Sequence, residues 1–134
     1  MTRTAVCALV GVLASTFALS LGAAEPQAKN PSLGKVRHVV IFKFKATATP
    51  EQIKSVEDAF RALPTKIPNV EGYEWGTNVS PENLAQGFTH CFLLTFPTTA
   101  ARDAYLPHPA HKAFGKLLHP YLDKVFVIDF VAKE

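Results

Sequence analysis

Several side chains capable of proton transfer lie in one short stretch of this sequence. The stretch from Tyr105 to His111 contains a tyrosine, two histidines and two prolines. Proline lacks a backbone N–H and fixes its own φ, so a helix ending near Tyr105 is broken here and a new helix can begin at Pro109. His111 would then lie in the first turn of the new helix, where the helix dipole opposes an imidazolium and favours the neutral ring that a general base requires. The alternative interpretation is a helix break whose histidines, His108 included, only cap and solvate it.

Three more polar side chains fall on strand faces that are otherwise apolar. His38 and His90 alternate with phenylalanines, and Asp129 shares its face with Val125 and Val127. A carboxylate in such a place is costly unless it is paired or hydrogen-bonded. Each histidine taken alone is consistent with a buried core side chain that has found a hydrogen-bond partner.

Antiparallel pairing of the first and last strands would bring Asp129 close to His38. A helix covering this end of the sheet would place His111 on the same pair. Asp129 would then hold the tautomer of His111, which would act as the base, with Tyr105 as the acid. His90 begins a strand that runs the opposite way, so we expect it to lie further off.

The elements that must position these residues follow from hydrophobic periodicity. Runs rich in Val, Ile and Phe predict four strands, over residues 36–45, 70–79, 88–97 and 123–131. Strand, helix and strand therefore occur twice, at an offset of 52 residues that places His38 on His90 and Phe44 on Phe96. This pattern predicts an α+β fold of the ferredoxin-like β-α-β-β-α-β kind, with one antiparallel sheet and its helices on one face.

The helix boundaries are indicated by capping residues and prolines. The segment from Thr49 to Gln52 has the pattern of a capping box with proline at the first helical position, and Pro64 is expected to close that helix. Thr98 or Thr99 is expected to cap a short helix that ends at Tyr105.

The sheet face turned away from the helices is expected to be strongly apolar. It would carry Val39, Ile41, Cys91, Leu93, Phe126, Ile128 and Phe130. So large an apolar surface does not stay exposed to water, and two-fold pairing is the commonest way to cover it. We therefore expect a homodimer with a barrel-like centre between two sheets.

The N-terminus has the features of a secretory signal. Arg3 precedes an apolar run, and Gly22 and Ala24 are the small residues expected before a cleavage site. The run is shorter than the roughly 20 residues that span a bilayer, which argues against an uncleaved anchor. We expect a signal peptide over residues 1–24, a flexible leader over 25–35 and one domain over 36–134, in a secreted or periplasmic protein with no membrane contact after cleavage.

Charge and cysteine content exclude several classes of protein. The net charge is only +3 and no cluster of Lys and Arg is present, so a nucleic-acid partner is not expected. Beyond the signal region Cys91 is the one cysteine, which excludes an internal disulfide and thiolate zinc sites. His108 and His111 are spaced for a metal, but a proline between them and only a carboxylate in reach argue against a metal site.

The region from His38 to Phe130 resembles the stress-responsive dimeric α/β-barrel (Dabb) family. The resemblance rests on the first-strand histidine in HVVIFKFK, on Gly87 to His90 (GFTH), on His108 to His111 (HPAH) and on FVIDF in the last strand. Within the family the chain is similar to polyketide cyclases that close a linear poly-β-keto acid by aldol condensation. That similarity implies His111 as base, Tyr105 as acid and Asp129 as the residue that orients His111.

The resemblance also implies a pocket for a small apolar carbonyl or phenolic ligand, with no cofactor. His38 and His90 would lie beside this pocket, and its other substrate-binding residues would be Phe60, Tyr73, Phe92 and Leu117. Two alternatives stay open. One is a stress-response dimer that binds a ligand without turnover, and the other is a cofactor-free monooxygenase-like member of the same superfamily.

Overall fold

The central strand of the sheet is β1 (Val36–Phe44), which pairs with two neighbours. It runs antiparallel to both β3 (His90–Phe96) and β4 (Leu122–Val131). Strand β2 (Gly72–Thr77) extends the sheet beyond β3, giving the order β2-β3-β1-β4. This is the ferredoxin-like arrangement predicted from the sequence. The computed structural model describes residues 30–134, so the predicted signal peptide and the first part of the leader lie outside the described residues.

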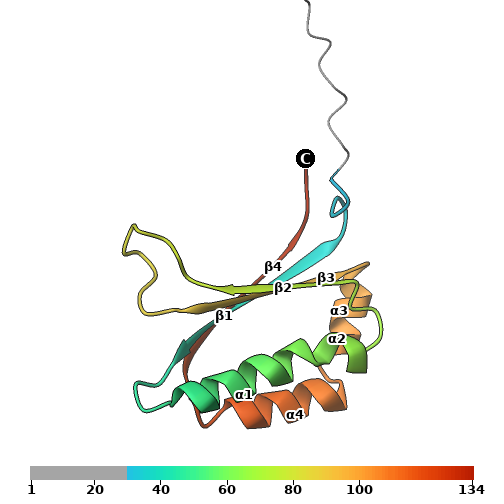
Figure 1. Ribbon diagram of the computed structural model, residues 1–134. Helices are drawn as coiled ribbons and strands as arrows, with labels where there is room; N and C mark the ends of the chain where they lie inside the picture. The colour runs from blue at the N-terminus through green and yellow to red at the C-terminus, as the bar shows by residue number, and fades with distance from the viewer. Residues whose placement is uncertain (1–29) are drawn as a thin grey trace, which may run out of the picture.

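The helices all lie on one face of this sheet (Figure 1). They are α1 (Pro50–Arg61), α2 (Leu63–Lys66), α3 (Thr99–Tyr105) and α4 (Pro109–Leu118). Helices α1 and α4 run side by side under the sheet, whereas α3 lies at one end, against β1 and β3.

The helix starts follow local capping chemistry. Thr49 and Gln52 form the predicted capping box, and the Thr98 hydroxyl accepts a hydrogen bond from the backbone of Ala101. Pro64 differs from expectation, because it occupies the first turn of α2 and so continues the helical path after a one-residue break. The start of α4 is capped by His108, whose Nδ1 accepts from the backbone N–H of Ala110 at 3.1 Å.

The core between helices and sheet is filled by aromatic rings. Phe60 of α1 stacks on Phe92 of β3, with ring centroids 4.2 Å apart and planes at 11°. Phe42 and Phe114 close around this pair, and all four rings are almost fully buried. Dense ring packing of this kind dominates the stability of a small core.

The opposite face of the sheet carries none of these four helices and exposes the predicted apolar residues. Phe126, Ile128 and Phe130 of β4 are each close to half exposed. Val125 and Val127, on the other side of the same strand, are equally exposed because β4 is an edge strand that the helices do not cover. An edge strand with two apolar faces requires covering by another surface.

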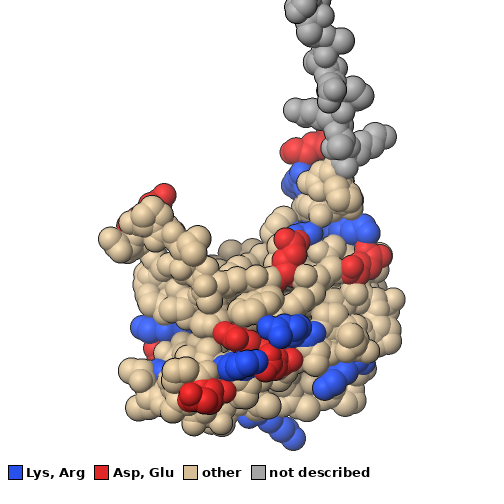
Figure 2. Space-filling model, in the orientation of Figure 1, with Lys and Arg blue, Asp and Glu red and all other residues tan. Residues whose placement is uncertain are grey.

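Charged side chains on the helical side are intermixed rather than gathered by sign. Figure 2 shows Lys and Arg beside Asp and Glu over the helices, whereas the segment between β2 and β3 projects from the body with little charge. Within residues 30–134, no helix is long and apolar enough to cross a membrane. The second half of the predicted leader forms a turn held to the end of β4, since the backbone of Gly34 donates to Ala132.

Pairing through the exposed sheet face predicts the effect of a charge placed there. Replacing Ile128, which is 46% exposed, with Lys should give a monomer of lower stability, because a buried unpaired charge costs several kcal/mol. Leu117→Lys is the matched control, since Leu117 is 39% exposed on the helical side. Sedimentation velocity at micromolar concentration should show a wild-type and Leu117→Lys dimer. A monomeric wild-type protein would contradict the pairing.

Candidate functional site

The register of β1 and β4 places His38 directly opposite Asp129, as the sequence predicted. Nδ1 of His38 lies 2.6 Å from Oδ1 of Asp129. An ionised carboxylate can only accept, so Nδ1 of His38 carries the proton and donates it. In the neutral ring, Nε2 is then left with its lone pair.

The second oxygen of Asp129 is engaged by a residue that the sequence analysis missed. Nη1 of Arg102, on α3, forms an ion pair with Oδ2 of Asp129. The sequence signal was the spacing, because Arg102 precedes Tyr105 by three positions and therefore shares its face of the helix. The two side chains reach the same end of the sheet.

The predicted orientation of His111 by Asp129 is wrong. Among the hydrogen bonds of residues 30–134, none joins these two side chains, since Asp129 is occupied by His38 and Arg102. Nδ1 of His111 instead lies 2.9 Å from the backbone carbonyl oxygen of Leu106. A carbonyl only accepts, so this contact fixes the same tautomer that Asp129 was expected to fix, with Nε2 available as a base.

Tyr105 lies between the two histidines. Its ring centroid is 5.9 Å from that of His38 and 4.5 Å from that of His111. Tyr105 and His38 are buried, whereas His111 is partly exposed. The helix break between α3 and α4 thus brings one phenol and two imidazoles together, which confirms that Tyr105, His111, His38 and Asp129 converge at one end of the sheet.

Burial sets the protonation states of this cluster. Desolvation, together with the nearby charges of Arg102 and His111, lowers the pKa of His38 from 6.5 to about 4. Desolvation raises the pKa of Tyr105 well above its usual value of 10. At neutral pH the cluster therefore holds a neutral imidazole that can accept a proton and a phenol that retains its own.

His90 lies at the opposite end of the same face, as predicted. It is paired with Phe42 across the strands, four positions along β1 from His38. Its Nε2 lies 3.1 Å from Oε1 of Glu57 on α1, and its Nδ1 lies 2.8 Å from the hydroxyl of Thr89. Protein groups thus occupy both ring nitrogens, in contrast to His38.

The predicted substrate-binding residues divide into two groups. Phe60, Phe92 and Tyr73 line the helix-covered interior, where Tyr73 stacks against Phe60. The Tyr73 hydroxyl is buried and has no hydrogen-bond partner among the described residues, so it is a donor available to a ligand. Leu117 lies outside this interior, in a small hollow of about 170 Å³ between α1 and α4.

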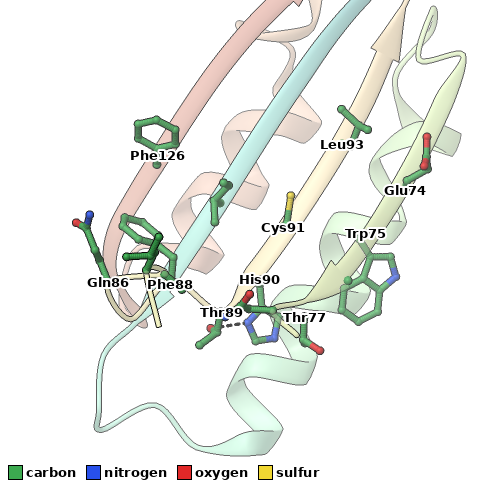
Figure 3. A pocket seen from close by; sticks show the side chains of 15 residues that line it. Glu74, Trp75, Thr77, Gln86, Phe88, Thr89, His90, Cys91, Leu93 and Phe126 are labelled. Carbon is green, nitrogen blue, oxygen red and sulfur yellow. Dashed lines mark hydrogen bonds between the residues drawn. The ribbon is translucent and has the colours of Figure 1, made fainter. Parts of the chain in front are cut away.

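A larger hollow, of about 630 Å³, lies on the face without helices. Figure 3 shows Phe88 and Phe126 on one side of it and Trp75 on the other, with Cys91 between them. The turn into β3 that borders it requires Gly87, because φ there is +83° and a Cβ would lie 2.8 Å from the Lys43 side chain. Of the predicted site residues, His90 lines this hollow, whereas Tyr105, His111 and Asp129 do not.

The stress-responsive A/B barrel domain family matches residues 36–132, nearly all of the described chain. The chain belongs to this family. The stress-response A/B barrel domain-containing protein HS1 of Arabidopsis thaliana is 40% identical over 97 residues, which are 72% of this chain and 89% of that protein. Olivetolic acid cyclase of Cannabis sativa is 28% identical over 99 residues, which are 74% of this chain and 98% of that protein.

Solved structures of similar proteins show the same fold. The hydroxynitrile lyase of Passiflora edulis aligns with a TM-score of 0.71 at 28% identity, covering 78% of this chain and 97% of that chain. A dimeric ferredoxin-like protein of unknown function from Thermobifida fusca aligns with a TM-score of 0.63 at 26% identity, covering 73% of this chain and 91% of that chain. The family and the ferredoxin-like fold predicted from the sequence are therefore confirmed.

The low pKa of His38 predicts how stability depends on pH. The unfolded chain binds a proton at this residue below about pH 6.5, whereas the folded chain binds it only near pH 4. Unfolding is therefore favoured as the pH falls through this window, by up to about 3 kcal/mol. Urea unfolding at pH 7 and pH 4.5 should show that His38→Gln, whose amide can still donate to Asp129, loses less unfolding free energy at the lower pH than wild type does. An equal loss of unfolding free energy in both proteins would show that His38 titrates normally.

Proposed function

We propose that this protein is an exported, cofactor-independent acid/base member of the A/B barrel family that acts on a small apolar carbonyl or phenolic ligand. The observation that carries the proposal is the placement of Tyr105 between two histidines whose hydrogen bonds leave Nε2 as the acceptor. Such a cluster suits removal of a proton from the carbon next to a carbonyl, followed by aldol closure or isomerisation. The cyclase and the lyase among the relatives support the proposal.

The roles follow from exposure and pKa. His111 is the more exposed of the two histidines and takes the proton from carbon through Nε2. The Tyr105 phenol keeps its proton at neutral pH and donates it in a hydrogen bond to the carbonyl oxygen, where negative charge develops. His38 lies against the other side of Tyr105 and orients the phenol.

The test is exchange of the α-protons of a simple aryl ketone in D₂O, followed by ¹H NMR at pH 7.5. Wild-type protein should accelerate exchange, and His111→Gln and Tyr105→Phe should each lose roughly a hundredfold or more of that acceleration, as expected for a positioned acid or base. His119→Gln is the matched control, since His119 is exposed at the end of α4. Full acceleration in His111→Gln would exclude it as the base.

A binding function without turnover is favoured by one observation. Tyr105 is only 1% exposed and His38 only 4%, and stacked rings fill the adjoining interior. A ligand must therefore displace packed side chains to reach them. In this alternative, a ketone or phenol would perturb the Tyr105 and His111 resonances in NMR spectra without any exchange of its α-protons.

Export is proposed from the Arg3 start and the Gly22 and Ala24 pair. Mass spectrometry of protein purified from its native source should find an N-terminus within one or two residues of Glu25. An intact N-terminal Met1 in that protein would contradict export by cleavage.

A further inference from the structure

We propose that Arg102 is a positioning residue that keeps His38 a neutral proton acceptor. It does so by fixing the orientation of the Asp129 carboxylate and by offsetting its negative charge. The catalytic meaning of this inference rests on the proposed function, but the ion pair and its effect on His38 can be measured without any substrate. None of the residues predicted from the sequence has this role.

The position of Arg102 follows from the geometry of α3. Arg102 and Tyr105 are one helical turn apart, so the same helix presents a guanidinium and a phenol to one end of the sheet. Nη1 of Arg102 pairs with Oδ2 of Asp129, and its Nε donates to Oδ1 of Asp103 at 3.0 Å. The Arg102 and Asp129 side chains are only 20% and 24% exposed, so solvent screens their interaction weakly.

The ion pair divides the two oxygens of Asp129 between two partners. Oδ2 meets the guanidinium, which leaves Oδ1 to accept from Nδ1 of His38 at 2.6 Å. Asp129 thus has one partner on each carboxylate oxygen. The guanidinium fixes the orientation of the carboxylate from the side opposite His38, and through it the His38 tautomer.

The charges around His38 explain why the guanidinium is needed. The charged and titratable groups that face His38 are Asp129 from β4, Arg102 and Tyr105 from α3, and His111 from α4. Asp129 alone would favour the imidazolium, because a carboxylate next to an imidazole stabilises its charged form. Arg102 opposes that effect: burial is the largest cause of the low His38 pKa, and the charge of Arg102 is the next. Loss of the guanidinium would leave a partly buried carboxylate beside His38 without its ion-pair partner.

The experiment is a pH titration of the histidine ring nitrogens by long-range ¹H–¹⁵N NMR, without ligand, in wild type and in four variants. In wild type, His38 should remain neutral with its proton on Nδ1 down to about pH 4. Arg102→Gln should raise the His38 midpoint by about one unit, roughly a tenfold change in acidity. Adding Asp129→Asn to that variant should reverse the rise, because the uncompensated charge is then gone.

Two further variants complete the test. Arg102→Lys keeps the positive charge but loses the planar fork of the guanidinium. The His38 midpoint should therefore stay low while the His38 tautomer becomes mixed. This variant remains informative if Arg102→Gln does not fold. Arg61→Gln is the matched control, because Arg61 pairs with Asp58 on α1, away from this cluster. An unchanged His38 midpoint in Arg102→Gln, or a midpoint raised equally by Arg102→Lys, would overturn the proposal.

The ketone exchange assay separates this inference from the proposed function. If this inference and the proposed function both hold, the pH midpoint of the acid limb of the exchange-rate profile rises in Arg102→Gln, in parallel with the His38 midpoint. A shifted His38 midpoint in a protein that catalyses no exchange supports the role of Arg102 and counts against the proposed enzyme. Exchange that persists with no shift at His38 supports the enzyme and overturns the role of Arg102.

Discussion

The hydrogen bond between His38 and Asp129 joins the packing of this domain to its chemistry. β1 is central, so its helix-facing side chains are buried between two neighbouring strands and the helices. An imidazole in that position requires a polar partner, because an unpaired buried donor costs about 1–3 kcal/mol. The antiparallel register with β4 supplies the partner at the opposite residue. The same contact then dictates which ring nitrogen remains available, so the tautomer is a consequence of the fold.

The two halves of the fold carry related histidines with different consequences. His38 and His90 occupy equivalent positions in the repeated strand-helix-strand units, and each contacts a carboxylate. The carboxylate that contacts His38 comes from the neighbouring strand, whereas the carboxylate that contacts His90, that of Glu57, comes from α1. Thr89 hydrogen-bonds to the second nitrogen of His90. His90 therefore links β3 to α1 and has both ring nitrogens occupied. Among residues 30–134, the second ring nitrogen of His38 has no hydrogen-bond partner and Tyr105 lies beside the ring, which is why we place the chemistry at this end of the sheet.

The sequence predicted those features that depend on strand periodicity and on prolines. Alternation within the strands gave the register that brings His38 to Asp129, and the prolines around His108 gave the break that turns His111 toward Tyr105. The contacts of Arg102 and of the Leu106 carbonyl were not predicted. The first depends on the rotation of α3 against the sheet, and the second involves a backbone atom that every residue possesses. Both are set by tertiary packing.

The interior packing also could not be predicted in detail from the sequence. Periodicity identified Phe60 and Phe92 as inward-facing, but their stacking at 4.2 Å depends on how α1 settles on the sheet. The Tyr73 hydroxyl is also buried without a partner among the described residues, so the interior combines tight packing with an unused polar group. A site of this kind would open only when a ligand enters it.

The central claim is that a ligand binds on the helix-covered face, at the end where Tyr105, His111 and His38 meet. The most direct test is an NMR titration of uniformly labelled protein with an aryl β-keto acid and with a phenol. The ring signals of Phe88 and Phe126, whose centroids lie 6.5 Å apart, report on the hollow of the opposite face. Saturable shifts of the His38 and His111 ring signals with unmoved Phe88 and Phe126 rings would support the claim. Shifts of these two phenylalanine rings with unmoved histidine rings would contradict it.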